Sequence, residues 1–263
     1  MTELNADTAR RAIVEHTRRL AESAAAAGPD AAVPTAPKWT VTDLVAHVGQ
    51  TQNWVAEIIE RRVTDPTRLP TEMAALPADP RDWPAWLPES AQRVASACSD
   101  DALDAPVFNA AGDQRSGTRF WLAGMLNEAV LHGVDAANAA DRPADIATAL
   151  IDNHLAMLTS PTGDMQRPES AHTLRGTGQT LQWRATDTAD DAGAWFVERR
   201  PDGATWQPGT RPADVTVTGP ARSLLLILTR RLPLDDREAT DISVDGDTGF
   251  AQHWLDNTAH ASN

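Results

Sequence analysis

The chain has 263 residues, a formal net charge of −14 at pH 7 and a single cysteine, Cys98. Its length allows two domains that each bury a core, and one cysteine forms no disulfide within the chain. The acidic charge argues against nucleic acid or an anionic membrane as a partner, because both attract basic surfaces. No stretch reaches the length of a membrane span and no basic-then-apolar signal opens the sequence, so we expect a soluble, cytoplasmic protein.

The first part of the chain is expected to be helical. Apolar periodicity predicts helices over residues 6–27, 40–62, 83–98, 120–140 and 143–158. The proline-rich segment between the second and third of these predicts a long surface loop. Thr40 is a natural N-cap, and Asp43 completes an acidic capping box at the start of the second helix.

A Glu–His pair and one further histidine stand out within these helices. Glu128 and His132 lie four residues apart, so a helix places both side chains on one face. A carboxylate and an imidazole held in this way are two ligands for a divalent metal, and His47 is the candidate for the third. The neighbours of the pair are apolar or small, and a buried carboxylate without a partner is costly. The alternatives are a solvated Glu–His pair and a core histidine bound to a backbone carbonyl.

Cysteine and tryptophan have simpler interpretations. Cys98 has no adjacent histidine and no second cysteine, so we expect it to be inert packing near a helix end. Most of the nine tryptophans fall among apolar residues at helical or strand spacing, which favours core packing over a stacking surface. The exception is Trp54, which follows His47 by seven residues on the same helix face and is expected to line a pocket.

The composition and the hydrophobic pattern of the sequence change from Ser160 onwards. Residues 160–170 are rich in proline, glycine and polar residues, which is typical of a linker. Alternating runs then predict strands over residues 172–178, 180–187, 194–200, 213–219 and 241–246, with helices over residues 221–232 and 248–259. Grouped strands followed by helices indicate an α+β domain. The expected domains are therefore residues 1–160 and residues 168–263.

Three segments carry a resemblance to a known family. WTVTDLVAHV, residues 39–48, and WLAGMLNEAVLHGVD, residues 121–135, resemble the N-terminal domain of mycothiol-dependent maleylpyruvate isomerases. VTVTGPARSLLLILTRR, residues 215–231, is similar to the strand–Gly–helix signature of the second domain of that family. The resemblance implies a DinB-like four-helix bundle followed by a smaller α+β domain. It also implies that His47, Glu128 and His132 bind zinc or another divalent metal.

The resemblance further implies a metal-dependent, mycothiol-dependent isomerase or thiol transferase whose partners are a small thiol and a small electrophilic, maleylpyruvate-like substrate. In such an isomerase, zinc holds mycothiol as the thiolate, which adds to an electrophilic carbon. The adduct rotates and expels the thiol to give the trans product. Arg231 matches a functionally important arginine of the second domain, and it would orient a carboxylate of the substrate.

Two departures from the family pattern keep alternatives open. Asn127 stands just before Glu128, where the family often has arginine; this removes a cation from the rim of the site and argues against a dianionic substrate. The pair Arg230–Arg231 stands where the family tends to have Gly–Arg. Both departures are compatible with a non-catalytic protein that binds a metal or a thiol conjugate. A purely structural bundle without a metal is the third interpretation.

Overall fold

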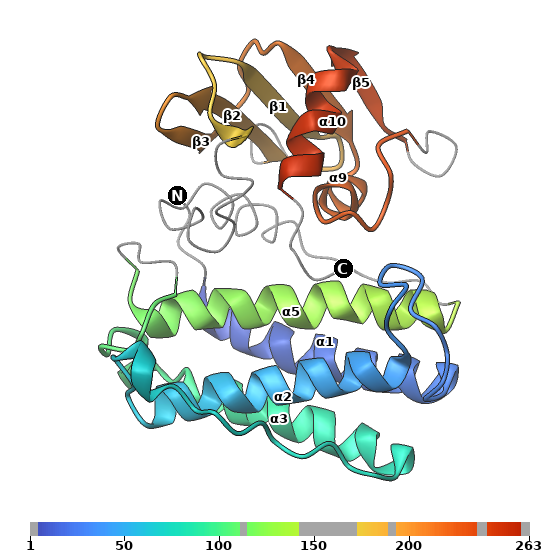
Figure 1. Cartoon of the computed structure of the whole chain (residues 1–263), viewed down its shortest axis with the longest axis vertical. Helices are drawn as coiled ribbons and strands as arrows, with labels where there is room; N and C mark the ends of the chain where they lie inside the picture. The colour runs from blue at the N-terminus through green and yellow to red at the C-terminus, as the bar shows by residue number, and fades with distance from the viewer. Residues whose placement is uncertain (1–4, 111–114, 142–172, 189–192, 236–240, 259–263) are drawn as a thin grey trace. The chain divides into compact units, whose positions relative to one another are not determined.

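The computed structural model describes residues 5–110, 115–141, 173–188, 193–235 and 241–258 (Figure 1). The chain divides into two compact units, Thr2–Ile146 and Ala147–Ser262. The first unit is helical and the second contains a mixed five-stranded sheet, as the α and α+β prediction requires. None of the described helices combines the length and the hydropathy that crossing a bilayer needs.

Within its described residues the first unit contains four long helices: α1 (Ala6–Ala27), α2 (Val41–Glu60), α3 (Trp83–Ala97) and α5 (Gly117–Ala139). Both α1 and α2 pack against α3 and against α5, so every long helix has at least two neighbours (Figure 1). Shorter pieces connect them: the 3₁₀ turns η1 (Pro66–Arg68) and η2 (Pro80–Asp82), and the helix α4 (Asp100–Leu103). The predicted fifth helix and the linker after it lie outside the described residues.

Local sequence signals explain where the helices begin. The capping box of Thr40 and Asp43 is present at the start of α2, as its sequence predicts. The α5 helix begins at Gly117, earlier than predicted, because the Ser116 hydroxyl accepts a hydrogen bond from the backbone N–H of Arg119. A Cβ atom at Gly117 would lie 2.0 Å from the carbonyl oxygen of Val107, so only glycine permits this close approach.

The core of the helical unit is apolar, with one polar network at its centre. Buried Leu44, Val48 and Leu87 belong to a cluster that joins α2 and α3 to α1. Within this core the Gln52 amide donates to the Thr17 hydroxyl at 2.8 Å and accepts from the Ser90 hydroxyl at 2.7 Å. The network satisfies three buried polar side chains from α1, α2 and α3, and it fixes the register of α2.

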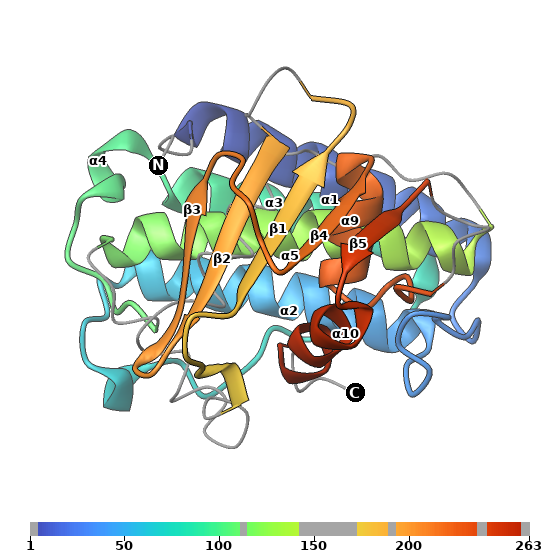
Figure 2. The same ribbon diagram turned by 90° about the horizontal axis from the view of Figure 1, so that it is seen from above.

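The described residues of the second unit form five strands: β1 (Thr180–Ala185), β2 (Ala194–Arg200), β3 (Gly203–Pro208), β4 (Val215–Gly219) and β5 (Ser243–Gly246). They lie in the order β3-β2-β1-β4-β5, as Figure 2 shows. The β1–β4 pair is parallel and the other pairs are antiparallel. The helices α9 (Ala221–Leu228) and α10 (Thr248–Asn257) pack against the central strands and complete the α+β unit.

Large side chains fill the core between sheet and helices. Trp183 of β1 faces Trp195 of β2 and Val217 of β4 in the sheet register, and all three are at most 1 % exposed. Because alternate residues of a strand share one face, this register gathers the apolar set on the covered side. The leucines of α9 and Trp254 of α10 are buried as well.

Three predictions for this unit need correction. Residues 172–178 form no strand in their described part; Gly176 and Gly178 instead donate their N–H groups to the carbonyls of Arg200 and Arg199 in a turn. The strand β3 was not predicted, because GATWQP carries glycine and proline and alternates weakly. The α9 helix ends at Leu228 rather than at residue 232, because Arg230 takes a left-handed backbone with φ of 63°. The expected domain boundary lies outside the described residues and stays a prediction.

Candidate metal centre

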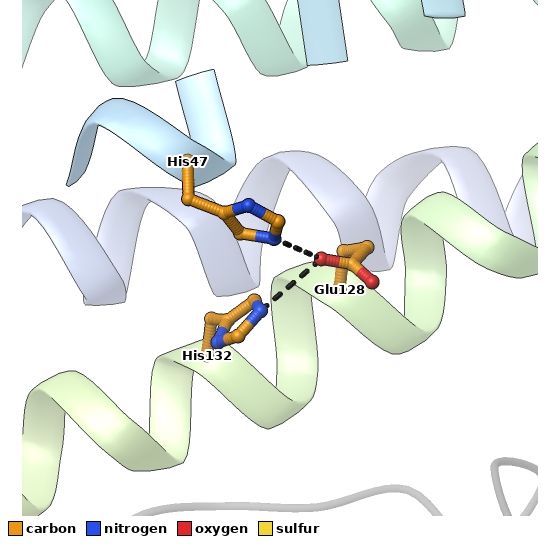
Figure 3. Close-up of side chains that lie close together, drawn as sticks. All are labelled: His47, Glu128 and His132. Carbon is orange, nitrogen blue, oxygen red and sulfur yellow. Dashed lines mark hydrogen bonds and ion pairs between the residues drawn. The ribbon is translucent and has the colours of Figure 1, made fainter. Parts of the chain in front are cut away.

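The structure brings His47, Glu128 and His132 together between α2 and α5 (Figure 3). The Oε2 atom of Glu128 lies 2.9 Å from Nε2 of His47 and 3.1 Å from Nε2 of His132. One ligand atom from each side chain lies within 4.8 Å of the other two. The i, i+4 spacing on α5 accounts for the Glu128–His132 contact, and the packing of α2 on α5 adds His47.

The donor set fits a divalent metal. Two imidazole nitrogens and one carboxylate oxygen are the ligands that zinc takes in three-residue protein sites, which leave a further position open. The three side chains are partly accessible: 37 % of His47, 33 % of Glu128 and 15 % of His132 is exposed. Among the described residues, no second group of three such side chains meets the same spacing.

Electrostatics holds the metal-free centre in a charged form. Burial opposes ionisation of Glu128, but hydrogen bonds from His132 and His47 outweigh it and hold the pKa of this carboxyl well below its ordinary value. Burial likewise opposes the charged form of His132, yet hydrogen bonds to Asp135 and Glu128 raise its pKa to about 9. At neutral pH the metal-free protein therefore keeps a proton between His132 and Glu128, where a metal ion would bind.

A second carboxylate, that of Asp135, orients the His132 ring by contacting its Nδ1 atom. The Nδ1 atom of His132 lies 2.8 Å from Oδ2 of Asp135, and Oδ1 of Asp135 accepts a hydrogen bond from the Thr35 hydroxyl at 2.6 Å. The Asp135 side chain is only 2 % exposed. An ionised carboxylate at Nδ1 favours the tautomer that keeps the proton there, and this leaves Nε2 free as a ligand atom. This role of Asp135 was not predicted, although the residue follows His132 by three positions on the helix.

Trp39 forms one wall of the centre. Its ring stacks near the His132 ring, with centroids 5.9 Å apart, and its centroid lies 5.0 Å from that of His47. The tryptophan immediately precedes the cap of α2, so the cap that starts the helix also places this ring. Trp54 was the predicted pocket wall, and this position of Trp39 was not predicted.

The comparison with protein families agrees with this architecture. A model of the mycothiol maleylpyruvate isomerase N-terminal domain matches residues 10–137, and this range includes all three candidate ligands. A model of the C-terminal domain of the same family matches residues 141–253. The chain belongs to the mycothiol-dependent maleylpyruvate isomerase family. No match of significance occurs among curated proteins.

Two solved structures of a mycothiol-dependent maleylpyruvate isomerase resemble this chain. The first has 18 % sequence identity and a TM-score of 0.50. The second, a variant with a histidine replaced by alanine, has 17 % identity and a TM-score of 0.54. Each alignment covers 86 % of this chain and 91 % of the other. At this identity the likeness supports the fold that the family shares.

The two departures from the family pattern fall in different surroundings. Asn127 is 6 % exposed, and a step of one residue turns its side chain about 100° around α5 from that of Glu128. Its effect on the rim of the candidate site stays a prediction. Arg230 donates to the carbonyls of Ile227 and Leu228 and so closes the C-terminal end of α9.

Arg231 and Cys98 complete the candidate residues. Arg231 follows the end of α9 in the second unit, where its backbone N–H donates to the carbonyl of Leu226 at 2.7 Å. Its role towards a substrate stays a prediction.

Cys98 is fully buried, and this burial raises the pKa of its thiol to about 12. A thiol that is buried and un-ionised agrees with the expected packing role.

Proposed function

We propose that this protein is a metal-dependent, mycothiol-dependent isomerase or thiol transferase that acts on a small electrophilic, maleylpyruvate-like substrate. The observation that supports it most strongly is the His47–Glu128–His132 centre, which lies within the segment that matches the family's N-terminal domain. The proposal includes a DinB-like four-helix bundle for the first unit. It also includes the cytoplasm as the compartment, since the single buried cysteine suits a reducing environment.

The ligands of the proposed metal are His47 and His132 through Nε2 and Glu128 through a carboxylate oxygen. When bound, a divalent metal supplies a Lewis acid that keeps a thiol ionised near neutral pH. Asp135 keeps a proton on Nδ1 of His132 and so presents Nε2 to the cation. Trp39 shields the imidazole rings from water on its side of the centre.

Arg231 is proposed to orient the substrate. A guanidinium binds a carboxylate through two parallel N–H donors, which fixes the direction of a small acid better than a point charge does. The family's substrate class carries carboxylates, and Arg231 is the residue that matches the family's important arginine. The neighbouring Arg230 closes α9 and donates to the Thr258 hydroxyl at 2.7 Å, and the Arg231 guanidinium donates to the carbonyl of Thr229 at 3.3 Å.

Turnover by the zinc-loaded protein tests this function. We expect conversion of maleylpyruvate to the trans isomer that depends on added mycothiol, measured by the change in ultraviolet absorbance. His47→Ala protein should lose this activity, because it lacks one ligand. Binding of zinc and mycothiol without turnover of any maleylpyruvate-like electrophile would instead support the non-catalytic binding protein. A wild-type protein that binds no divalent metal would reject the proposal.

A further inference from the structure

An aromatic pair lies beside the candidate metal centre, on the same two helices. Trp54 follows His47 by seven residues on α2, and Trp121 precedes Glu128 by seven residues on α5. Seven residues are about two helical turns, so each tryptophan shares a helix face with a proposed ligand. The two indole rings meet edge to face, with centroids 5.6 Å apart and planes at 87°. The metal centre and the aromatic pair therefore lie along one line between α2 and α5.

Gly124 leaves space between these two features. It lies three residues after Trp121 and four before Glu128, so it belongs to the same side of α5. A Cβ atom there would meet no heavy atom within 4 Å. Packing accounts for Gly49 of α2, where a Cβ would lie 2.2 Å from the Trp86 ring. No such neighbour requires glycine at position 124, although glycine weakens a helix relative to alanine. The space itself is the feature that this glycine preserves.

The chemistry of the aromatic pair disfavours an anionic ligand. The Trp54 indole donates to the carbonyl of Pro70 at 2.9 Å, and the Trp121 indole donates to that of Phe108 at 2.8 Å. Both polar N–H groups are thus engaged, and the rings offer only faces and edges. An aromatic face carries the negative part of its quadrupole, which repels a carboxylate and attracts polarised C–H groups or a cation. A dianionic electrophile is poorly suited to this surface.

The distance along α5 decides between the two substrates of a thiol-dependent reaction. With a rise of about 1.5 Å per residue, Gly124 lies about 6 Å and Trp121 about 10 Å from Glu128 along the helix axis. A small electrophile must touch the sulfur at the metal centre, so it has little length left to reach the tryptophans. The thiol has its sulfur at the centre and its body free to extend. Mycothiol carries its cysteinyl thiol on neutral, hydroxylated rings.

We propose that Trp54, Trp121 and Gly124 form a subsite that binds the ring portion of the thiol cofactor. The proposal rests on the proposed function, because it places the sulfur of that thiol at the His47–Glu128–His132 centre. C–H groups on one face of a ring pack against an indole, and the space over Gly124 admits the link between the ring and the sulfur. The subsite would select a ring-bearing thiol over a plain cysteine derivative.

Filling the space over Gly124 tests this subsite, and the same position provides the matched control. Leucine and alanine both favour a helix and a Cβ here meets nothing, so we expect Gly124→Leu and Gly124→Ala to fold and to bind zinc like the wild type. Calorimetric titration of the zinc-loaded proteins should show mycothiol binding about tenfold weaker in the leucine variant, the loss expected when one aromatic contact is denied. The alanine variant should match the wild type. N-acetylcysteine, which has no ring, should bind all three proteins alike.

Each other outcome has a distinct meaning. Equal affinity of the leucine variant and the wild type for mycothiol would overturn the subsite while leaving the proposed function intact. The same holds if N-acetylcysteine binding weakens equally, or if only the KM of the electrophile rises. Mycothiol binding that is weakened by leucine, in a wild type that shows no turnover, would reject the proposed function and keep the subsite. Wild-type protein that does not bind mycothiol would reject both.

Discussion

The two units of this protein differ in the side chains that occupy the centre of their cores. In the helical unit Gln52 joins Thr17 and Ser90, and Asp135 joins Thr35 to His132. In the sheet unit the largest buried side chains are tryptophans, and the indole N–H groups of Trp183 and Trp254 have no hydrogen-bond partner within the described residues. Paired polar groups fix positions, whereas buried rings mainly supply apolar area. The polar pairs of the helical unit therefore position side chains at the candidate site, whereas large rings fill most of the sheet unit's core beside the buried, hydrogen-bonded Gln182 and Thr258.

The largest effect is expected from the ligands themselves. Glu128→Ala and His132→Ala proteins should lose stoichiometric zinc and any thiol-dependent activity, because each removes a ligand and leaves two. Cys98→Ser is the control: it places a hydroxyl in a fully buried position and should lower the melting temperature, but it should keep one zinc. Elemental analysis after dialysis measures the metal. Equal zinc in all three purified proteins would place the metal elsewhere.

The next largest effect is expected on the free energy of unfolding of the sheet unit, with no effect on zinc binding. Trp183→Ala should destabilise that unit by about 3–5 kcal/mol, since it leaves a large cavity in a fully buried site. Trp183→Phe should cost much less, because it keeps a ring and sacrifices no hydrogen bond seen in the described structure. Urea denaturation followed by circular dichroism provides the measurement. Zinc loss from the folded Trp183→Ala protein would contradict the assignment of the metal to residues of the helical unit.

A smaller effect is expected from the carboxylate behind His132. Asp135→Asn keeps the shape of the side chain but weakens its hold on Nδ1, and zinc affinity should fall about 10- to 100-fold. Asp101→Asn, an exposed change on α4, serves as the matched control and should leave affinity unchanged. Competition with a chromophoric chelator gives both constants. Identical affinities in the two variants would remove Asp135 from the metal centre.

Arg231 is expected to affect the substrate alone. Arg231→Ala should raise the KM of a carboxylate electrophile about tenfold, the energy of one hydrogen bond between charged groups, without changing zinc content. Arg231→Lys should have a KM close to that of the alanine variant, because lysine cannot bind a carboxylate through two parallel N–H donors. Steady-state kinetics at saturating thiol supplies the values. Unchanged KM in the alanine variant would reduce Arg231 to a helix-end charge.

The smallest expected signal is the release of a proton. The raised pKa of His132, about 9, means that the folded metal-free protein holds this proton at pH 7, and a cation at Nε2 must displace it. Zinc binding should therefore release about one proton at pH 7, and affinity should rise with pH until it levels off above about 9. Calorimetry in buffers of different ionisation enthalpy counts the protons. No release at pH 7 would show that His132 is neutral before zinc binds.

The parts of the site that follow from local pattern were predictable from sequence. The capping box at Thr40 and the four-residue spacing of Glu128 and His132 depend only on neighbours along the chain, and both are present. Asp135 lies three residues after His132, which is also a helical-face spacing. It was not predicted as part of the site because it contacts the proposed ligand His132 rather than the proposed metal. Helix α2 was placed within two residues at each end.

The features that depend on packing between distant segments could not be predicted. The contact of Trp39 with both imidazoles arises when α2 packs on α5, and so does the meeting of Trp54 with Trp121. Strand β3 is stabilised by its hydrogen bonds to β2 rather than by its own weak alternation. The open space at Gly124 likewise exists only in the folded unit.

A crystal structure of the zinc-loaded protein, with anomalous scattering recorded at the zinc edge, tests the central claim most directly. We expect one zinc ion about 2.0 to 2.2 Å from Nε2 of His47, from Nε2 of His132 and from a carboxylate oxygen of Glu128. Asp135 should still contact Nδ1 of His132 in that structure. Zinc bound at other residues, or no anomalous peak between α2 and α5, would contradict the metal centre and the functions proposed for it.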